Sequence, residues 1–287
     1  MNANELLISL ELGLIYGIAA MGIYLTFRII DFADLTCDGS FVLGAAVSAV
    51  LIKAGFHPLI ALLMSGIAGG CAGLCTGILN IYFKVGDILS GILVAYMLYS
   101  VNLKIMAGTP NIALIDINTL FTALNPLVVL MLLAIGAWLS ISFILSTDFG
   151  LALRSLGQNK RLALNCGINL SKMTLLGLVL SNGLIGVSGS LFSQHQGFAD
   201  ISQGLGTIII GFASVMIGEK LLPYRSVWIT ILSCLVGSII YRIILALALH
   251  SEWLGLQTQD LNLITGILVV VTMWLPPLKI ISKRSKK

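Results

Sequence analysis

The sequence predicts an all-α, polytopic membrane protein, and three observations support this prediction. The 287-residue chain is 58% hydrophobic, only 10% of its residues are charged, and its mean hydropathy is +1.04. A soluble domain carries about 25% charged residues, so one aqueous core could not hide this much apolar surface. The apolar runs are continuous and not alternating, which favours membrane helices over the strands of a membrane barrel.

Apolar segments that could cross a bilayer, which takes about 20 helical residues, recur along the whole chain. The 30 glycines suit helices that approach one another closely in lipid. The second and seventh segments are short for a full crossing and could be half-helices buried in protein. We expect eight or nine transmembrane helices in a single domain over residues 1–287. The candidate spans are 5–27, 39–52, 58–83, 88–106, 123–145, 174–192, 205–218, 227–249 and 261–281.

The longest segment that a bilayer would reject is the connector, residues 146–173. Thr147 or Asp148 can cap a short helix with one apolar face, and Ser171 can cap the span that follows. Gly167 stands where a second short helix would end in a left-handed conformation. We expect two short amphipathic helices, whose apolar face would enter a groove of a partner or lie on its own bundle. The ionisable residues of the connector are Asp148, Arg154, Lys160, Arg161 and Lys172.

Basic residues predict the orientation of the chain. If the connector faces the cytoplasm, 13 of the 16 lysines and arginines lie on the cytoplasmic side, and Lys53, Lys104 and Arg242 are the exceptions. This asymmetry places the N-terminus outside and the C-terminus inside. One re-entrant segment would reduce the number of spans to eight and move one terminus to the other side.

A short motif occurs twice. Phe32-Ala33-Asp34-Leu35-Thr36 and Phe198-Ala199-Asp200-Ile201-Ser202 each precede a helix rich in small residues, and they lie 166 positions apart. Five predicted spans separate them, and an odd number places the two copies on opposite membrane faces. This pattern is typical of an inverted-topology repeat, which many transporters use to build a central path.

No catalytic or metal-binding constellation is present in the sequence. The chain lacks the P-loop pattern for ATP, its five cysteines lack zinc spacing, and its small positive charge indicates orientation and not nucleic-acid binding. We therefore expect no metal, no cofactor and no nucleic-acid partner. Glu11, Lys104 and Arg242 fall inside spans, where they could face a polar path, reach the surface, or pair, for instance Glu11 with Arg242. The three histidines, among them His195, fall at outer span ends and are typical of wet loops.

The connector carries a family resemblance. Its pattern T-x-F-G-L-A-L-R-S-x-G-x-N…A…G-I-N, residues 147–169, resembles the cytoplasmic loop in permease subunits of bacterial ABC importers of the branched-chain amino acid and ribose type. Residues 28–34, with Gly39, Ser40 and Gly44, are similar to the family motif after the first span, where Asn-Phe-Ala-His-Gly is common. Asp31 replaces that Asn, and Asp34-Leu35 replaces His-Gly. Residues 98–102 and 108–111 resemble a subgroup described as tryptophan/tyrosine-type or uncharacterised permeases.

The resemblance implies the role of the chain and its partners. Two permease copies would form a pathway in the bacterial inner membrane, and ABC ATPase subunits would dock under the connectors. An extracytoplasmic binding protein would deliver a small solute, for which we expect an amino acid. The chain itself would not be an enzyme. The implied ATPase-coupling residues are Phe149, Gly150, Arg154, Gly157, Gly167, Glu219 and Lys220. The expected pathway residues are Asp31, Phe32, Asp34, Thr36, Asn102, Asp200 and Ser202.

The alternative function is a self-contained secondary transporter of a small solute. It would need an ion-coupling site, and the predicted spans offer few carboxylates for one. An intramembrane enzyme is disfavoured because the spans lack paired acid and base groups. The substitutions at Asp31 and Asp34 also argue against a simple transfer of branched-chain amino acid specificity.

Overall fold

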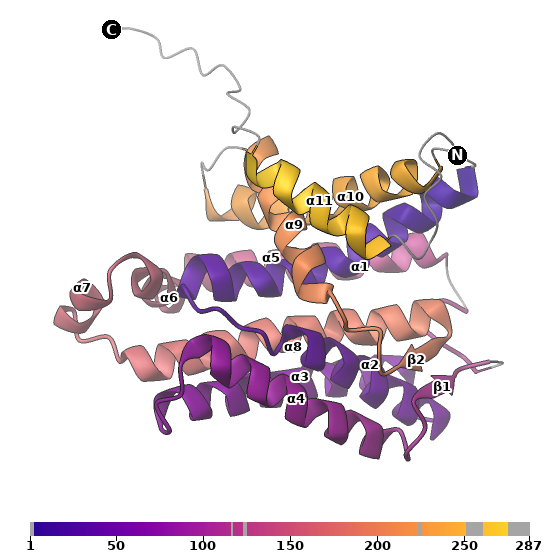
Figure 1. Cartoon of the computed structure of the whole chain (residues 1–287), viewed down its shortest axis with the longest axis horizontal. Helices are drawn as coiled ribbons and strands as arrows, with labels where there is room; N and C mark the ends of the chain where they lie inside the picture. Colours follow the sequence, from indigo (N-terminus) through magenta and orange to yellow (C-terminus); the bar gives the residue numbers. More distant parts are fainter. Residues whose placement is uncertain (1–2, 116, 123–124, 223–225, 251–260, 275–287) are drawn as a thin grey trace, which may run out of the picture.

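The computed structural model describes residues 3–115, 117–122, 125–222, 226–250 and 261–274. These residues form a bundle of helices with one two-stranded antiparallel sheet (Figure 1). The elements are α1 (Ala3–Tyr24), the π-helix η1 (Leu25–Ile30), α2 (Cys37–Lys53), α3 (Pro58–Ile81), α4 (Asp87–Ile105), β1 (Asn111–Ala113), α5 (Pro126–Ser146), α6 (Asp148–Gln158), α7 (Lys160–Asn165), α8 (Leu170–Gln196), β2 (Phe198–Asp200), α9 (Thr207–Leu221), α10 (Val227–His250) and α11 (Leu261–Trp274).

The structure supports the all-α, polytopic prediction. Every one of the nine candidate ranges contains a helix, although the end of the last range, 275–281, lies outside the described residues. Six helical segments among the described residues are long and apolar enough to cross a membrane. The predicted eight or nine crossings therefore exceed what length and composition support. The helices that fall short are α2, with 17 residues, α9, with 15, and α11, with 14.

The connector forms two short helices, as predicted. Figure 1 places α6 and α7 at one end of the bundle, the connector end, and β1 and β2 at the opposite end, the sheet end. Gly167 follows α7 with a φ of +78°. Thr147 stands at the N-cap of α6, as predicted, but its side chain makes no cap hydrogen bond. The side chain of Asn159 caps α7, and that of Asn169 caps α8 in place of Ser171.

The sheet was not predicted. No strand was expected in the sequence, whereas Asn111–Ala113 pairs with Phe198–Asp200. Three residues are too few to show an alternating pattern, and the partner strands are far apart in sequence, so no local signal indicated the pairing.

Glycines allow the central helices to touch backbone to backbone. A Cβ atom on Gly69 of α3 would lie 2.2 Å from the carbonyl oxygen of Asn182 in α8, and one on Gly186 would lie 2.5 Å from that of Ser65. A side chain at either position would push α3 and α8 apart. The contact explains why small residues line these helices, since association in lipid depends on close packing.

The two short helices α2 and α9 begin inside the bundle. Ser40, near the start of α2, donates a hydrogen bond to Asn182, the thirteenth of the 27 residues of α8. The non-helical segment 31–36 therefore leads back from the connector end to the middle of α8 before α2 starts. At the start of α9, the backbone amide of Ile208 binds the side chain of Asp38 in α2, 2.9 Å away. Both helices are short because each begins partway through the bundle.

We predict that Gly69→Ala destabilises the protein by about 1–3 kcal/mol, because the added methyl group overpacks the contact between α3 and α8. Gly136→Ala in α5 is the matched control, since a Cβ there meets no atom within 4 Å. Thermal unfolding of the detergent-solubilised variants measures the difference. Equal midpoints for the two variants would contradict the packing account.

Candidate functional site

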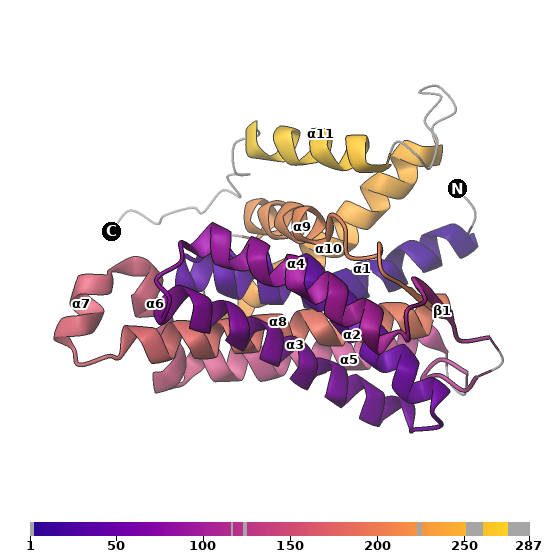
Figure 2. The same ribbon diagram turned by 60° about the horizontal axis from the view of Figure 1, so that its bottom comes forward.

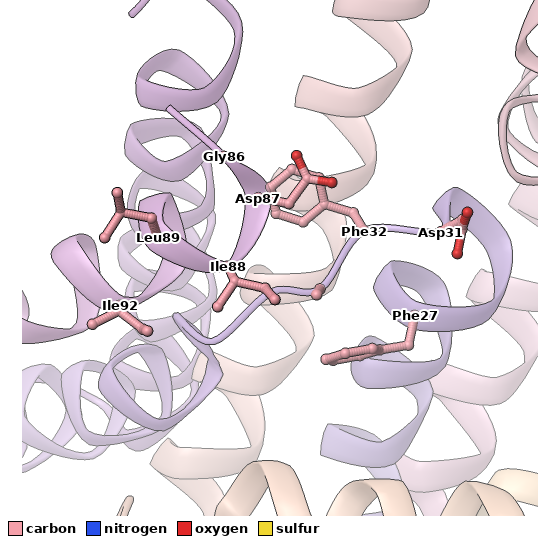
Figure 3. A pocket seen from close by; sticks show the side chains of 9 residues that line it. Phe27, Asp31, Phe32, Gly86, Asp87, Ile88, Leu89 and Ile92 are labelled. Carbon is pink, nitrogen blue, oxygen red and sulfur yellow. The ribbon is translucent and has the colours of Figure 1, made fainter. Parts of the chain in front are cut away.

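Two pockets follow one face of α4 and together form what we call the α4 groove. The inner pocket, about 710 Å³, lies towards the connector end, and the outer pocket, about 580 Å³, lies towards the sheet end. Ile92 lines both pockets, so they adjoin. Figure 3 shows Ile88, Leu89 and Ile92 of α4 on one side of the inner pocket and Phe27 and Asp31 on the other. Segment 31–39 forms the wall opposite α4 in both pockets.

Segment 31–36 is held in its non-helical path by side chains that replace helical hydrogen bonds. After the π-helix, Asp31 adopts a left-handed conformation with φ +57° and ends the helix. The carboxylate of Asp34 accepts hydrogen bonds from the backbone amide of Thr36, at 2.9 Å, and from the side-chain amide of Asn182, at 2.6 Å. The hydroxyl of Thr36 bonds that of Thr76 in α3 at 2.6 Å.

This buried network places the first group of predicted pathway residues. Asp31 and Phe32 line the inner pocket, whereas Asp34 and Thr36 are fully buried behind it and line neither pocket. Asp34 and Thr36 therefore hold segment 31–36 in place, whereas Asp31 and Phe32 line the groove.

Asp38 is the residue that connects the two short helices. It stands in the first turn of α2 and accepts hydrogen bonds from the backbone amides of Ile208, at 2.9 Å, and Gly206, at 3.3 Å. These amides are the unpaired donors at the start of α9, where a negative charge is favourable. Asp38 also lines the outer pocket, so one carboxylate holds α9 and faces the groove.

The remaining pathway candidates lie towards the sheet end. Asn102 lines the outer pocket, whereas Asp200 and Ser202 flank Ile201, which lines it. The carboxylate of Asp200 accepts hydrogen bonds from Ser202 and, at 3.1 Å, from Asn111 across the sheet. Partial burial acts to raise the pKa of Asp200, but these hydrogen bonds lower it below its ordinary value. Asp200 and Ser202 thus fix the turn that precedes α9.

The predicted coupling residues gather at the connector end. A Cβ on Gly150 would lie 2.3 Å from the Cα of Leu145, so the turn from α5 into α6 is tight. A Cβ on Gly157 would lie 2.4 Å from the carbonyl oxygen of Ile29, so α6 packs directly on η1. Phe149 packs against the same core, in which Leu153 is buried. The apolar face of α6 therefore lies on its own bundle, which was one of the two expectations.

Apolar surface remains open on both helices of the connector. Leu151 of α6 is 55% exposed, Leu162 and Leu164 of α7 are 59% and 56% exposed, and Figure 1 and Figure 2 show α7 projecting from the bundle. Gly167, also exposed, ends this projection. The arrangement divides the connector into α6, which touches the bundle, and α7, which is available to a partner.

A polar cavity of about 390 Å³ separates α6 from the start of α10. Arg28 and Arg154 both line it. Arg28 also forms an ion pair of 2.5 Å with Glu219, which joins η1 to α9. The Arg28 side chain is 48% exposed, so we expect this pair to contribute no more than about 1 kcal/mol to stability. Lys220 follows at the same end of α9.

Two of the ionisable residues inside the spans, Glu11 and Arg242, make contacts within the bundle. Glu11 binds His195, with 2.8 Å between Oε2 and Nε2, and not Arg242, which was the example partner. His195 is therefore mostly buried at the end of α8 and is not a wet loop residue. The guanidinium carbon of Arg242 lies 4.1 Å from the centre of the Tyr16 ring. Arg242 therefore makes a cation–π contact.

Sequence reasoning missed Asp38, Tyr96 and Tyr99 of the outer pocket. Asp38 follows the recognised motif by two positions, and its role depends on α9, 168 residues further along the chain. The tyrosines stand on an apolar helix without periodic polar neighbours. Only the placement of α4 beside segment 31–39 identifies them. Among the described residues, no group of three or more His, Cys, Asp or Glu side chains could hold a metal ion.

The fold and groove define a class, the helical membrane subunit of a transporter. A family model described as the branched-chain amino acid transport system permease component matches residues 6–273. The chain therefore belongs to this family.

Named relatives cover most of the chain. It is 40% identical to a tyrosine transport system permease protein of Clostridioides difficile, over 90% of this chain and 86% of that protein. It is 36% identical to an uncharacterised protein of Rickettsia prowazekii, over 94% of this chain and 97% of that protein. It is 29% identical to a probable branched-chain amino acid transport permease protein of Methanocaldococcus jannaschii, over 76% of this chain and 71% of that protein. No solved structure matches the chain.

Family membership establishes the general role. The chain is the permease component of an ABC importer, a multi-pass protein of the inner membrane, and not an enzyme. ATP hydrolysis takes place on a separate ATPase, and a solute-binding protein is a further partner of this class. This role replaces the alternative of a self-contained secondary transporter.

We predict that Asn182→Leu lowers stability by about 1–3 kcal/mol, because it removes one of the donors to the buried Asp34 carboxylate and the acceptor of the Ser40 hydroxyl. The double variant Asn182→Leu with Asp34→Leu removes the buried charge and should recover part of the loss. Chemical or thermal unfolding of the purified variants measures both effects. A single variant as stable as the parent would rule out the proposed role of the network.

Proposed function

We propose that this chain forms half of the translocation path of an amino acid importer and that the α4 groove is its contribution to the path. The observation that carries the proposal is the adjoining pair of pockets, which runs from the connector end towards the sheet end and is bordered by segment 31–39. Asp31, Phe32, Asp38 and Asn102 would contact the solute. Asp34, Thr36, Asp200 and Ser202 would hold the segments that line the path.

An amino acid is the proposed solute because of the relatives. One is named a tyrosine transport system permease, and the family description names branched-chain amino acids. The outer pocket has both polar and apolar groups for such a solute, since an aspartate, an asparagine and two tyrosines line it together with apolar residues of α4. Small-molecule sites commonly combine apolar walls with a few polar groups.

An inverted repeat is supported by the pattern of helix packing. α1 packs against α9 and α10, and α8 packs against α2 and α3. Exchanging α1, α2 and α3 with α8, α9 and α10, in that order, therefore gives the same set of contacts. Asp34 accepts from the amide of Thr36 at 2.9 Å, and Asp200 accepts from that of Ser202 at 2.8 Å. We propose that α2 and α9, each combined with the non-helical segment before it, complete two crossings. With α11, this would give nine crossings.

Movement of the ATPase would reach the groove through η1. Gly157 of α6 touches Ile29, and the π-helix leads directly into Asp31 and the wall of both pockets. The Arg28–Glu219 ion pair adds a second link, from η1 to α9. A displacement of α6 would thus move both segments that begin midway through the bundle. Exposed Leu162 and Leu164 on α7 would contact the ATPase itself.

A second copy of the chain would close the groove. α4 lines both pockets, and its Tyr96, in the outer pocket, is 82% exposed. A path for a polar solute must be separated from lipid, because polar groups are costly in hydrocarbon. We therefore propose a homodimer in which two α4 grooves face each other. The extracytoplasmic binding protein would dock at the sheet end.

The proposed function predicts ATP-dependent uptake only by the assembled importer. Proteoliposomes with permease, ATPase and binding protein should accumulate an amino acid when ATP is supplied, and permease alone should not. Uptake by the permease alone, driven by an ion gradient, would contradict the proposal.

We predict that Arg154→Glu lowers solute-stimulated ATPase activity by roughly tenfold, equivalent to about 1.4 kcal/mol of coupling free energy. The change reverses a charge where α6 faces Arg28 across the polar cavity. Lys53→Glu at the far end of α2 is the matched control and should leave stimulation unchanged. Unchanged coupling in a folded Arg154→Glu complex would exclude a role for this arginine.

The orientation can be tested with a native cysteine. Cys166 is exposed at the end of α7. A membrane-impermeant maleimide should label it in inside-out vesicles and not in intact spheroplasts, and Cys166→Ser should abolish that labelling. Labelling of Cys166 from outside would reverse the topology.

A further inference from the structure

The α4 groove is acidic. Among the described residues that line its two pockets, Asp31, Asp38 and Asp87 are carboxylates, and none is lysine, arginine or histidine. A cleft lined by charges of one sign and bounded by low-dielectric walls concentrates solutes of the opposite sign. The groove therefore favours a positively charged group over a negatively charged one.

The residues that line the outer pocket also include hydrogen-bond acceptors with unused capacity. Asn102 is only 1% exposed, and its side-chain nitrogen donates to the carbonyl oxygen of Gly39 at 3.3 Å. Its side-chain oxygen has no hydrogen-bond partner among the described residues. A buried acceptor without a partner is costly, so this oxygen marks a place where a donor can be gained.

Asp38 supplies the second acceptor. Each of its two oxygens accepts one backbone hydrogen bond from the start of α9. A carboxylate oxygen has two acceptor sites, so each oxygen retains one for a ligand. The helix N-terminus also stabilises the ionised form of this carboxylate within the bundle. Tyr96 and Tyr99 line the same pocket and present aromatic faces, which attract cations and pack against apolar groups.

We infer that the outer pocket is a recognition site for a protonated amino group, which binds between the Asp38 carboxylate and the Asn102 side-chain oxygen. An ammonium group carries three donors and no acceptor, which matches these acceptors. The tyrosines and the apolar face of α4 then hold the rest of the solute. This inference rests on the proposed function and deepens it, because it makes the amino group, and not the carboxylate, the feature that the permease itself selects.

The test compares ligands that differ only in their charged groups. Equilibrium binding is measured on the permease–ATPase complex in lipid nanodiscs without the binding protein. One series is tyrosine, tyramine and 3-(4-hydroxyphenyl)propanoate, and the aliphatic series is leucine, isopentylamine and 4-methylpentanoate. In at least one series, we expect the two amino-bearing compounds to bind at least about tenfold more tightly than the acid that lacks nitrogen, because a site built for a donor rejects analogues without it.

Asp38→Asn removes the charge and keeps one acceptor oxygen, so only one of the two amides at the start of α9 retains its partner. It should weaken binding of the amino-bearing compounds about tenfold and reduce their advantage over the acid. A cooperative thermal unfolding transition would show that the variant is folded. Glu5→Gln is the matched control, because Glu5 lies in the first turn of α1 and lines neither pocket, so its substitution should leave the preference unchanged.

Three outcomes would overturn the inference. They are equal or tighter binding of the acids, an unchanged preference in Asp38→Asn, and no binding of any amino-bearing compound. ATP-dependent amino acid uptake by the complete importer is measured in parallel. If that uptake persists, the proposed function stands although the recognition site is wrong. If it fails, the proposed function fails as well.

Discussion

The structure depends on keeping backbone hydrogen-bonding groups paired where two helices begin inside a membrane bundle. Lipid offers no partners to such groups, so side chains must replace them. Asp34 and Asn182 do this for the segment before α2, and Asp38 does it for the first turn of α9. The same requirement accounts for buried polar residues in an otherwise apolar protein. It also places carboxylates beside the groove, where they can act on a solute.

The contact between α3 and α8 is rigid, whereas segment 31–36 is the part that we propose can move. α3 and α8 meet through glycines with backbone contact, which leaves little freedom to slide. Segment 31–36, by contrast, is joined to α6 through a π-helix, a rare form often found at functional sites. Asp38 follows this segment in the first turn of α2 and links it to α9, so in the proposed coupling a shift of the connector would act on both walls of the outer pocket. Such coupling would need two arrangements of these segments, each favoured by a different state of the ATPase.

The sequence predicted helices more successfully than it predicted contacts. Hydropathy located a helix in every one of the nine ranges, and Gly167 marked the end of α7 as expected. The partner of Glu11 was left open, with Arg242 given as an example. In the structure Glu11 pairs with His195, 184 positions away, and no local pattern indicated that contact. Asp38 was missed because its partner amides belong to α9. Long-range contacts of this kind leave no periodic signal in the chain.

The central claim is that solute passes along the α4 groove, and solute protection of engineered cysteines tests it most directly. In a variant without the five native cysteines, Ser100→Cys places a thiol in the outer pocket, and Leu132→Cys places one on the exposed face of α5. The rate of modification by a small thiol reagent is measured in the assembled importer with and without amino acid. The account predicts that solute slows modification at position 100 and leaves position 132 unaffected. Protection at position 132 alone would place the path elsewhere and contradict the account.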